Sequence, residues 1–370
     1  GKKEMNNQKS VDSRSELETI KNRKKEGIDI PLKKGAQART TSTYLEYVRF
    51  AHNALPEIDY ADIETSCFFV NRRFSAPLII DSMTGGTPEA RKINERLGKL
   101  AQEYDIPMGL GSQRAGLKSK ELASTYEIAR KNAPNAFLIA NIGGAQLSSG
   151  LTVSEVEQIV EMIQADALVI HLNPLQELIQ PEGEPRYSGV LDQITKLVMN
   201  LDLPVMVKEV GAGISKEVAN RLEMAGVAAI NIAGSGGTSW AGVEKIRADA
   251  ARNRIKTHLG ELFWDWGIPT AISLIEVKRA VKKTSIIASG GLRNGLEVAK
   301  CVALGADMCA MAYPFLVAAA QSIDSLFGYM NLLLAELKST MFLLGSKNIE
   351  MLKSSRYILT GALAAEVNSP

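Results

Sequence analysis

The sequence is poor in cysteine and histidine, with three of each among its 370 residues. Cys67, Cys301 and Cys309 form no CxxC pair and have no histidine nearby. A disulfide framework or a thiolate metal site would need closer or more numerous cysteines. We therefore expect three buried, reduced thiols in a protein of the reducing cytosol.

The sequence also lacks a strong charge of either sign and a long apolar segment. Its 43 basic and 41 acidic residues give a net charge of +2, which does not favour nucleic acid or an acidic membrane as a partner. The longest C-terminal apolar stretch, 332–344, is interrupted by Glu336 and Lys338 and is shorter than the about 20 residues that a membrane helix needs. The polar N-terminus is unlike a secretory signal. These features predict a cytoplasmic protein without a membrane segment.

Short apolar runs, each ending in small or polar residues, recur along the chain. Eight are found, at 76–86, 108–112, 136–144, 167–173, 204–210, 228–234, 285–291 and 307–313. They are apolar on both faces, as in a parallel sheet covered by helices. Eight strand–helix units predict an α/β fold of the (β/α)₈ TIM-barrel type, with its core at about 76–316. A doubly wound open sheet is the alternative, although no GxGxxG turn follows the first run.

Helical patterns separate several of these runs. Ser154 and Glu157 form a capping box before one helix, and Ser215 begins another. The segment 296–304 is a third, ended by Gly305. The longest connection lies between the sixth and seventh predicted strands and contains all three tryptophans. Its length predicts a lid or an extra helical excursion.

The segments outside the barrel are read from their composition and position. We expect residues 1–20 to be a flexible N-terminal segment, with the four residues before Met5 compatible with an expression remnant. Residues 21–370 would form one domain, in which 317–357 are C-terminal helices packed on the barrel.

The run at 167–173 ends in an unusual cluster of polar residues, His171, Asn173, Gln176 and Glu177. In this type of barrel the active site lies at the C-terminal ends of the strands. The cluster would therefore face the mouth of the barrel. Alone, Glu177 is most simply a solvated loop carboxylate, but one carboxylate with substrate phosphate oxygens can also hold Mg²⁺.

Two further strand ends carry candidate anion-binding groups. Gly290 and Gly291 precede a helix, where backbone N–H groups bind phosphate, although a tight turn would explain these glycines equally well. Lys208 lies in an apolar strand and needs a polar partner, either an anionic cofactor or a carboxylate such as Glu209. The loop 234–240 contains three glycines and three hydroxyl side chains, which suits close approach to a ligand.

Taken together, these segments resemble the FMN-dependent type 2 isopentenyl-diphosphate isomerases. The matching stretches run in order from about Arg23 to the C-terminal helices and cover nearly the whole chain. They are NRKKEGI, HNALPEIDYADIETS, SMTGG, GLGSQR, ANIGG, HLNPLQE, VKEVGAGIS, AGSGGTSW, WGIPT, ASGGLRNG and ALGADMCAMAYPFL.

The resemblance implies a role for each matching residue. FMN would be contacted by Ser82, Met83, Thr84, Ser112, Asn141, Lys208 and Thr238, and its phosphate by Gly290, Gly291, Arg293, Met311 and Ala312. A prenyl diphosphate substrate would be contacted by Arg23, Lys24, Ser112, Arg114 and Gln176. Glu177 would carry Mg²⁺. On physical grounds, since the C5 tail is small and apolar, we expect Met83 and Trp240 to line its pocket. The family further implies a homo-oligomer, a tetramer or larger.

No protein group has a clear claim to protonate an unactivated alkene, so the difficult chemistry belongs to the cofactor. We hypothesise that reduced FMN is the acid–base, that NADPH serves only to reduce it, and that Gln176 and His171 are the catalytic side chains, which orient and support the substrate. One departure from the family is visible, since Gly27 stands where a histidine usually follows the Arg-Lys pair.

Three rival functions remain to be compared. A 2-hydroxy-acid oxidase would need a histidine base after the sixth strand, where AGSGGTSW has none. An inosine-monophosphate-dehydrogenase-like enzyme would need a loop cysteine, and none occurs between Cys67 and Cys301. A barrel that only binds flavin or a phosphorylated metabolite is the third.

Overall fold

The computed structural model describes residues 2–368, with side chains from residue 15 onward. Eight parallel strands form a closed barrel in the neighbour order β10-β11-β4-β5-β6-β7-β8-β9, and β9 pairs with β10 to complete the ring. The strands are β4 (Leu78–Ile80), β5 (Met108–Gly109), β6 (Leu138–Gly143), β7 (Ala167–His171), β8 (Val205–Lys208), β9 (Ala229–Asn231), β10 (Ser285–Ala288) and β11 (Met308–Met311). Each lies within one of the eight predicted runs, so the predicted barrel is confirmed.

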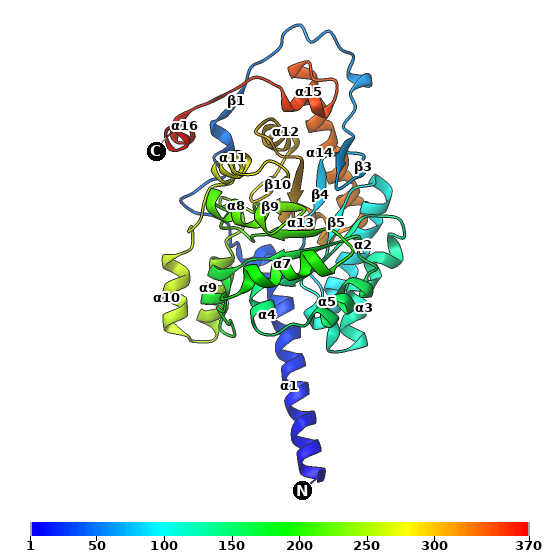
Figure 1. Cartoon of the computed structure of the whole chain (residues 1–370), viewed down its shortest axis with the longest axis vertical. Coiled ribbons are helices and arrows are strands. Elements are labelled where there is room, and N and C mark those ends of the chain that lie inside the picture. The colour runs from blue at the N-terminus through cyan, green and yellow to red at the C-terminus, as the bar shows by residue number, and fades with distance from the viewer. Residues whose placement is uncertain (1, 369–370) are drawn as a thin grey trace.

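A ring of helices covers the outside of the barrel (Figure 1). Because one face of each strand meets these helices and the other fills the interior, β6 is buried at all six positions. The helices that follow the successive strands are α2 (Pro88–Tyr104), α3 (Lys120–Asn132), α5 (Val153–Met162), α7 (Val190–Asn200), α8 (Lys216–Met224), α11 (Thr270–Ala280), α12 (Gly295–Ala303) and α13 (Tyr313–Gln321).

The helix boundaries agree with the sequence prediction at one start and one end, and differ at another start. Ser215 caps α8, and α12 ends just before Gly305, as predicted. The capping box of α5, however, is made by Thr152 and Glu155 rather than by Ser154 and Glu157. The chain offers two overlapping patterns of this kind, and the earlier one adds a further half turn of backbone hydrogen bonds.

The long connection after β9 is an excursion of two helices, α9 (Trp240–Ala250) and α10 (Arg254–Leu262), before α11. Trp264 is buried against Ile30, Ala36 and Val243, whereas Trp266 is exposed. The predicted helical excursion is thus confirmed, and it packs against the N-terminal segment.

The chain begins with α1 (Lys2–Asp29), which runs into the π-helical turn η1 (Ile30–Lys34). The N-terminal part of α1 projects away from the barrel (Figure 1), and its last turn buries Ile28. Of residues 1–20, expected to be flexible, residues 2–20 belong to this helix, and residue 1 is outside the described residues.

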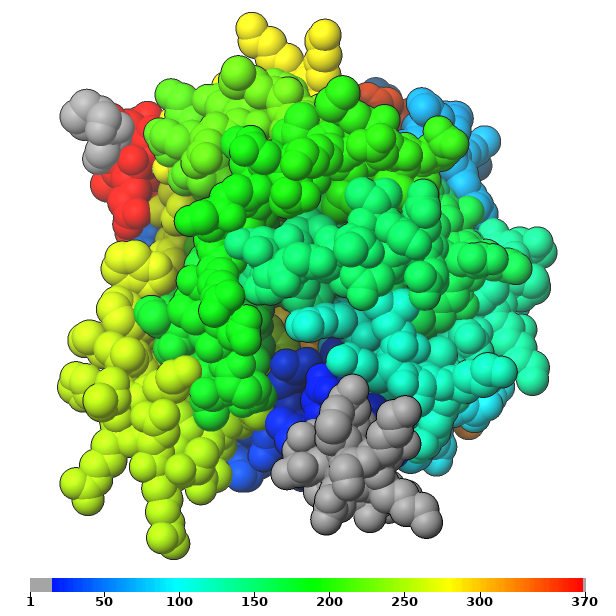
Figure 2. Space-filling model, turned by 60° about the horizontal axis from the view of Figure 1, so that its bottom comes forward, coloured from blue at the N-terminus to red at the C-terminus, as the bar shows by residue number. Residues whose placement is uncertain are grey.

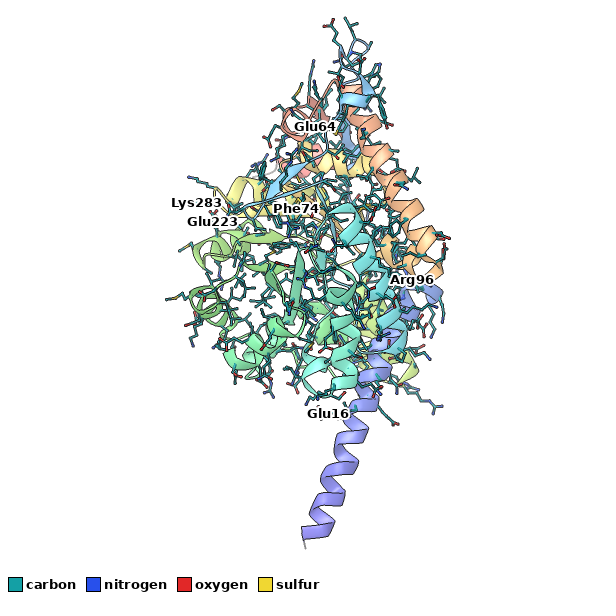
Figure 3. All side chains as sticks on the ribbon, turned by 90° about the vertical axis from the view of Figure 1, so that its right-hand side faces the viewer. Glu16, Glu64, Phe74, Arg96, Glu223 and Lys283 are labelled. Carbon is teal, nitrogen blue, oxygen red and sulfur yellow. The ribbon has the colours of Figure 1, made fainter. Side chains whose placement is uncertain are left out.

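The end of the barrel opposite α1 is covered by the hairpin of β2 (Cys67–Phe69) and β3 (Arg72–Phe74). Phe74 packs edge-on against Phe137, which precedes β6, and Cys67 contacts Met308 at the start of β11. Figure 3 shows Phe74 toward one end of the barrel and Glu16 of α1 beyond the other. The hairpin therefore closes the N-terminal ends of the strands and leaves the C-terminal ends for a site.

The predicted C-terminal helices are also present. They are α14 (Ile323–Leu344), α15 (Ile349–Lys353) and α16 (Gly361–Val367), and β12 (Tyr357–Leu359) pairs with β1 (Val48–Phe50). The short elements are α4 (Gly144–Ser148), α6 (Pro174–Ile179), η2 (Leu45–Tyr47), η3 (Tyr60–Asp62) and η4 (Arg114–Leu117). All three cysteines are free and buried, as expected. None of the described helices is both long and apolar enough to cross a bilayer.

Candidate active site

A cavity of about 250 Å³ lies at the C-terminal ends of the barrel strands, and α1 covers part of it. Figure 2, which looks at the end from which α1 projects, shows a hollow beside the N-terminal segment. The predicted site residues that line the cavity are Arg23, Lys24, Ser82, Met83, Thr84, Ser112, Asn141, His171, Gln176, Glu177, Lys208, Thr238, Gly290, Gly291, Arg293, Met311 and Ala312. Residues from distant parts of the chain are thus brought into one place.

Arg114 is the predicted site residue that the structure leaves outside this cavity. It is the first residue of η4 and is exposed. Its neighbour Gln113 is fully buried and donates a hydrogen bond to the carbonyl of Ile159, while its Oε1 accepts one from the backbone of Asn141. Because the buried amide fixes this turn, the next side chain points outward, and its contact with a substrate stays a prediction.

His171, at the end of β7, and Asn141, within β6, form a pair in which Asn141 is buried and His171 is half-buried. Nδ1 of His171 lies 2.7 Å from Oδ1 of Asn141, whose amide nitrogen donates to the carbonyl of Leu110. Asn141 Oδ1 is therefore the acceptor, and the proton of the imidazole sits on Nδ1. Burial, followed by the charges of Lys208, Lys24 and Arg23, lowers the pKa of His171 to about 3. His171 is consequently neutral at physiological pH, with Nε2 as an acceptor.

Helix α6 presents Gln176 and Glu177 to the cavity. Glu177 Oε2 accepts a hydrogen bond of 3.0 Å from the backbone of Glu184, and its Oε1 lies 3.3 Å from the amide of Asn173. Gln176 Nε2 donates to Oε1 of Glu244 at 3.0 Å. Glu177 is thus an oriented carboxylate, and Gln176 is an oriented amide.

Glu244 is a site residue that the sequence reading missed. It lies on α9, its side chain is 3% exposed, and burial raises its pKa. Its only signal in the sequence is an acidic residue directly after the apolar stretch WAGV that opens this helix. Nothing in the sequence places that helix beside α6, so the contact with Gln176 could not be foreseen.

Lys208 finds its carboxylate partner across the barrel. Its Nζ lies 3.8 Å from Oδ1 of Asp81 at the end of β4, and both side chains are buried. Asp81 also accepts from the amide of Asn231, whose Oδ1 accepts from the Ser289 hydroxyl. Glu209, the alternative partner, instead accepts three backbone N–H bonds from residues 210–212. A chain of buried polar groups therefore crosses the mouth.

Gly290 and Gly291 follow β10 in the left-handed region, with φ of 101° and 75°. A Cβ on Gly290 would lie 2.1 Å from the carbonyl oxygen of Gly234, and one on Gly237 would lie 2.6 Å from Cα of Gly291. The two glycine loops can approach this closely only because both lack side chains. The turn explanation for these glycines holds, and it leaves backbone groups facing the cavity.

Arg293 supplies positive charge beside these glycines. Its guanidinium donates to Oε1 of Gln37 at 2.9 Å, and the amide of Gln37 donates to the Thr238 hydroxyl. Burial lowers the pKa of Arg293, and the nearby Glu297 carboxylate accepts a hydrogen bond from the backbone N–H of Arg293. A half-buried cation whose guanidinium bonds to an amide oxygen and a backbone carbonyl, next to close-packed glycines, fits a phosphate group.

Lys24 brings a second half-buried cation, from α1. Its Nζ donates to the carbonyl of Ser112 at 3.0 Å, and the Tyr126 hydroxyl donates to the same oxygen. Burial, followed by the charge of Arg23, lowers the pKa of Lys24 to about 7. Gly27 also lines the cavity, and a Cβ there would meet nothing within 4 Å. The end of α1 therefore offers cationic groups and free space.

The cavity can hold two anionic groups, one near Arg293 and one near Arg23 and Lys24. In the described part of the chain no cluster of three or more His, Cys, Asp or Glu residues could hold a metal by itself. A divalent cation would therefore need oxygen ligands from a bound phosphate as well as from Glu177. The site suits a phosphorylated cofactor together with a second phosphorylated ligand.

Comparison with protein families agrees with this chemistry. Residues 185–359 match the family described as FMN-dependent dehydrogenase. An isopentenyl-diphosphate delta-isomerase of Nostoc sp. is 46% identical over 92% of this chain and 96% of its own. The enzyme of the same name from Methanothermobacter thermautotrophicus is 47% identical over 86% of this chain and 88% of its own. The enzyme of the same name from Pyrococcus furiosus is 44% identical over 92% of this chain and 86% of its own.

Solved structures with a similar fold are flavin-enzyme barrels. A mandelate oxidase variant matches with a TM-score of 0.61 and 19% identity over 93% of this chain and 98% of that one. A lactate oxidase of Pediococcus acidilactici matches with a TM-score of 0.63 and 16% identity over 93% of this chain and 94% of that one. At such low identity the likeness establishes the fold alone.

Proposed function

The chain belongs to the family of type 2, FMN-dependent isopentenyl-diphosphate delta-isomerases, and from this premise we propose that it converts isopentenyl diphosphate into dimethylallyl diphosphate. The reaction adds a proton at one carbon of the C5 chain and removes one from another, a step of isoprenoid biosynthesis. The observation that carries the proposal is the gathering of the cofactor-, substrate- and metal-type residues around one cavity, with Arg114 the exception.

FMN fits the cavity through the half-buried Arg293, the paired glycine loops and the buried Lys208. These groups would hold the phosphate and one edge of the ring system, together with Ser82, Met83, Thr84, Ser112, Asn141, Thr238, Met311 and Ala312, which all line the cavity. When bound and reduced, for which NADPH is the proposed reductant, FMN supplies proton donation and acceptance without net redox change.

The substrate diphosphate would lie against the end of α1. Arg23 and Lys24 provide positive charge there, and Glu177 would share Mg²⁺ with the diphosphate oxygens. Glu177 is already oriented by Asn173 and by the backbone of Glu184. A charge-assisted clamp of this kind holds the C5 chain in one position and keeps water from its double bond.

Gln176 and His171 would orient the reacting end. Gln176 is fixed from both ends of its amide: its Nε2 donates to Glu244, and its Oε1 accepts from the amide of Asn173 at 3.1 Å. The second lone pair of this oxygen and the second N–H of the amide are the groups it would offer to a ligand. His171 is neutral and therefore acts as a hydrogen-bonding group, since a pKa of about 3 makes it a poor acid or base near pH 7. Trp240 and Met83, both in the cavity lining, would enclose the apolar C5 tail.

We also propose a cytoplasmic homo-oligomer, a tetramer or larger, that needs no nucleic acid or membrane. Three unpaired, buried cysteines support a reducing compartment. Exposed apolar side chains at Ile255, Leu262 and Trp266 support contact with another copy. Light scattering after size-exclusion chromatography measures the assembly directly.

Anaerobic turnover in D₂O tests the activity. The protein is given FMN, Mg²⁺, NADPH and isopentenyl diphosphate, and the product is followed by NMR. We expect dimethylallyl diphosphate that contains deuterium, without stoichiometric loss of NADPH. Tight binding of reducible flavin with no product would refute the isomerase and favour a barrel that only binds flavin.

A further inference from the structure

Arg247 on α9 is a buried guanidinium that contacts three carboxylates at once. Its Nε lies 2.7 Å from Glu26, its Nη2 2.7 Å from Glu182, and its Nη1 2.6 Å from Glu244. The side chain of Arg247 is only 9% exposed. Each carboxylate comes from a different segment: α1, the loop between α6 and α7, and α9 itself.

These ion pairs differ from the other charged contacts of α1. Lys21 pairs with Glu121 and Glu16 pairs with Lys118, but all four side chains are substantially exposed. Exposed pairs contribute little because water and salt screen them. The Glu26 side chain is itself 44% exposed, but its partner Arg247 is 9% exposed and bonds to it at 2.7 Å, so this pair is screened less than a pair of two exposed side chains.

The position of Glu26 on α1 connects this pair to the site. Arg23 lies three residues earlier, hence on the same side of the helix, and Arg23, Lys24 and Gly27 all line the cavity. Lys24 is held on the far side by the Ser112 carbonyl. The turn 23–27 is therefore braced from two opposite walls of the mouth, by Ser112 and by Arg247.

We propose that Arg247 is a positioning residue for the diphosphate. By holding Glu26 it docks the turn 23–27 over the mouth and directs Arg23 and Lys24 into the cavity. The identity of the ligand rests on the proposed function, whereas the docking of α1 does not. Since Ile28 and Ile30 anchor only the segment that follows, loss of the Glu26 pair leaves the turn 23–27 braced on one wall alone, by Lys24 on the Ser112 carbonyl.

The expected kinetic signature is a change in KM rather than in kcat. If only a fraction of the molecules has the turn docked, apparent affinity falls by that fraction, and saturating substrate restores the docked state. FMN affinity stays unchanged, because the residues expected to bind FMN lie on the barrel. A loss of fold would instead lower every one of these quantities.

The variant Glu26→Ala removes the carboxylate that α1 contributes to Arg247 and leaves Arg247 paired with Glu182 and Glu244. Glu16→Ala is the matched control, because it makes the same substitution in the same helix but removes only the exposed ion pair with Lys118. We expect Glu26→Ala to raise KM for isopentenyl diphosphate at least about tenfold with kcat within about threefold, and Glu16→Ala to change neither. Glu26→Gln, which keeps an acceptor for Arg247, is expected to recover most of the loss.

A second readout does not need turnover. Trypsin cleavage after Arg23, Lys24 and Lys25, followed by mass spectrometry on the FMN-loaded protein, reports undocking of this turn. We expect about tenfold faster cleavage in Glu26→Ala than in Glu16→Ala or the unchanged protein. Should no variant turn over prenyl diphosphates, this difference still supports the docking role while the proposed function fails. Equal cleavage, an unchanged KM, or a loss of kcat alone in Glu26→Ala would overturn the proposal.

Discussion

The buried amine of Lys24 makes substrate binding depend on pH. Burial and the charge of Arg23 lower its pKa to about 7, and its hydrogen-bond partner is the neutral carbonyl of Ser112. A bound diphosphate brings negative charge next to the amine and raises the pKa again. Binding above pH 7 must therefore include the uptake of a proton, which weakens the apparent affinity as pH rises.

The size of the effect follows from the pKa. With a value of about 7 in the free protein, roughly nine in ten molecules carry the ammonium at pH 6 and roughly one in ten at pH 8. The KM for isopentenyl diphosphate should then rise roughly tenfold between pH 6 and pH 8. At pH 8 the complex should take up close to one proton, because the ligand restores the charged form.

Calorimetry measures this proton directly. Binding heats at pH 8 in buffers of different ionisation enthalpy give the number of protons taken up, and at this pH a phosphate with a pKa of about 6 no longer titrates. Lys24→Arg, which stays charged, should show no uptake and a flat KM, and Lys24→Met should bind weakly at every pH. Absence of proton uptake in the unchanged protein at pH 8 would refute the reasoning.

The remaining predictions concern the flavin site and the reacting end. Gly290→Ala places a Cβ 2.1 Å from the Gly234 carbonyl at a φ of 101°, so it should destabilise the fold by about 2 kcal/mol or more and weaken FMN binding. Gly27→Ala is the control: free space surrounds this position, so the melting temperature and the FMN titration should stay unchanged. Gln176→Ala should lower kcat about a hundredfold at unchanged FMN affinity, and full activity would contradict its assignment. Glu177→Gln should raise the Mg²⁺ concentration needed for half-maximal turnover at least about tenfold. Lactate and mandelate should not bleach the flavin under anaerobic conditions, and rapid bleaching would contradict the isomerase.

The strands were predictable because their signal is local. Each run is apolar on both faces, and a parallel barrel buries both faces, so the pattern of one segment is enough to identify it. The strand-end residues followed from the same reasoning, since strand ends of a barrel meet at one mouth. The position of the α5 cap was wrong by two residues, because two capping patterns overlap and only the full helix decides between them.

The partners of the buried charges were not predictable from local sequence. Asp81 lies 127 residues before Lys208, and Glu26 lies 221 residues before Arg247. Pairing at such separations is set by the closure of the barrel and by the docking of α1. A sequence can indicate that a buried lysine needs a partner, but the partner belongs to the tertiary structure.

Lys208 and Glu209 are adjacent in the sequence, yet their side chains have entirely different partners. Successive side chains of a strand point to opposite faces, so Lys208 points into the barrel mouth and Glu209 points away from it. Glu209 then closes the turn after β8 through three backbone N–H groups, which leaves Lys208 to Asp81 and to a ligand.

The shared barrel explains why a flavin oxidase and an isomerase resemble each other in fold but not in chemistry. The fold positions strand ends, and the side chains there decide the reaction. An oxidase of 2-hydroxy acids needs a base near physiological pH, but His171, the histidine that lines the cavity, has a pKa of about 3 and is therefore a weak base. The same neutral ring, fixed by Asn141, suits a substrate whose protons are exchanged with a cofactor rather than with the protein.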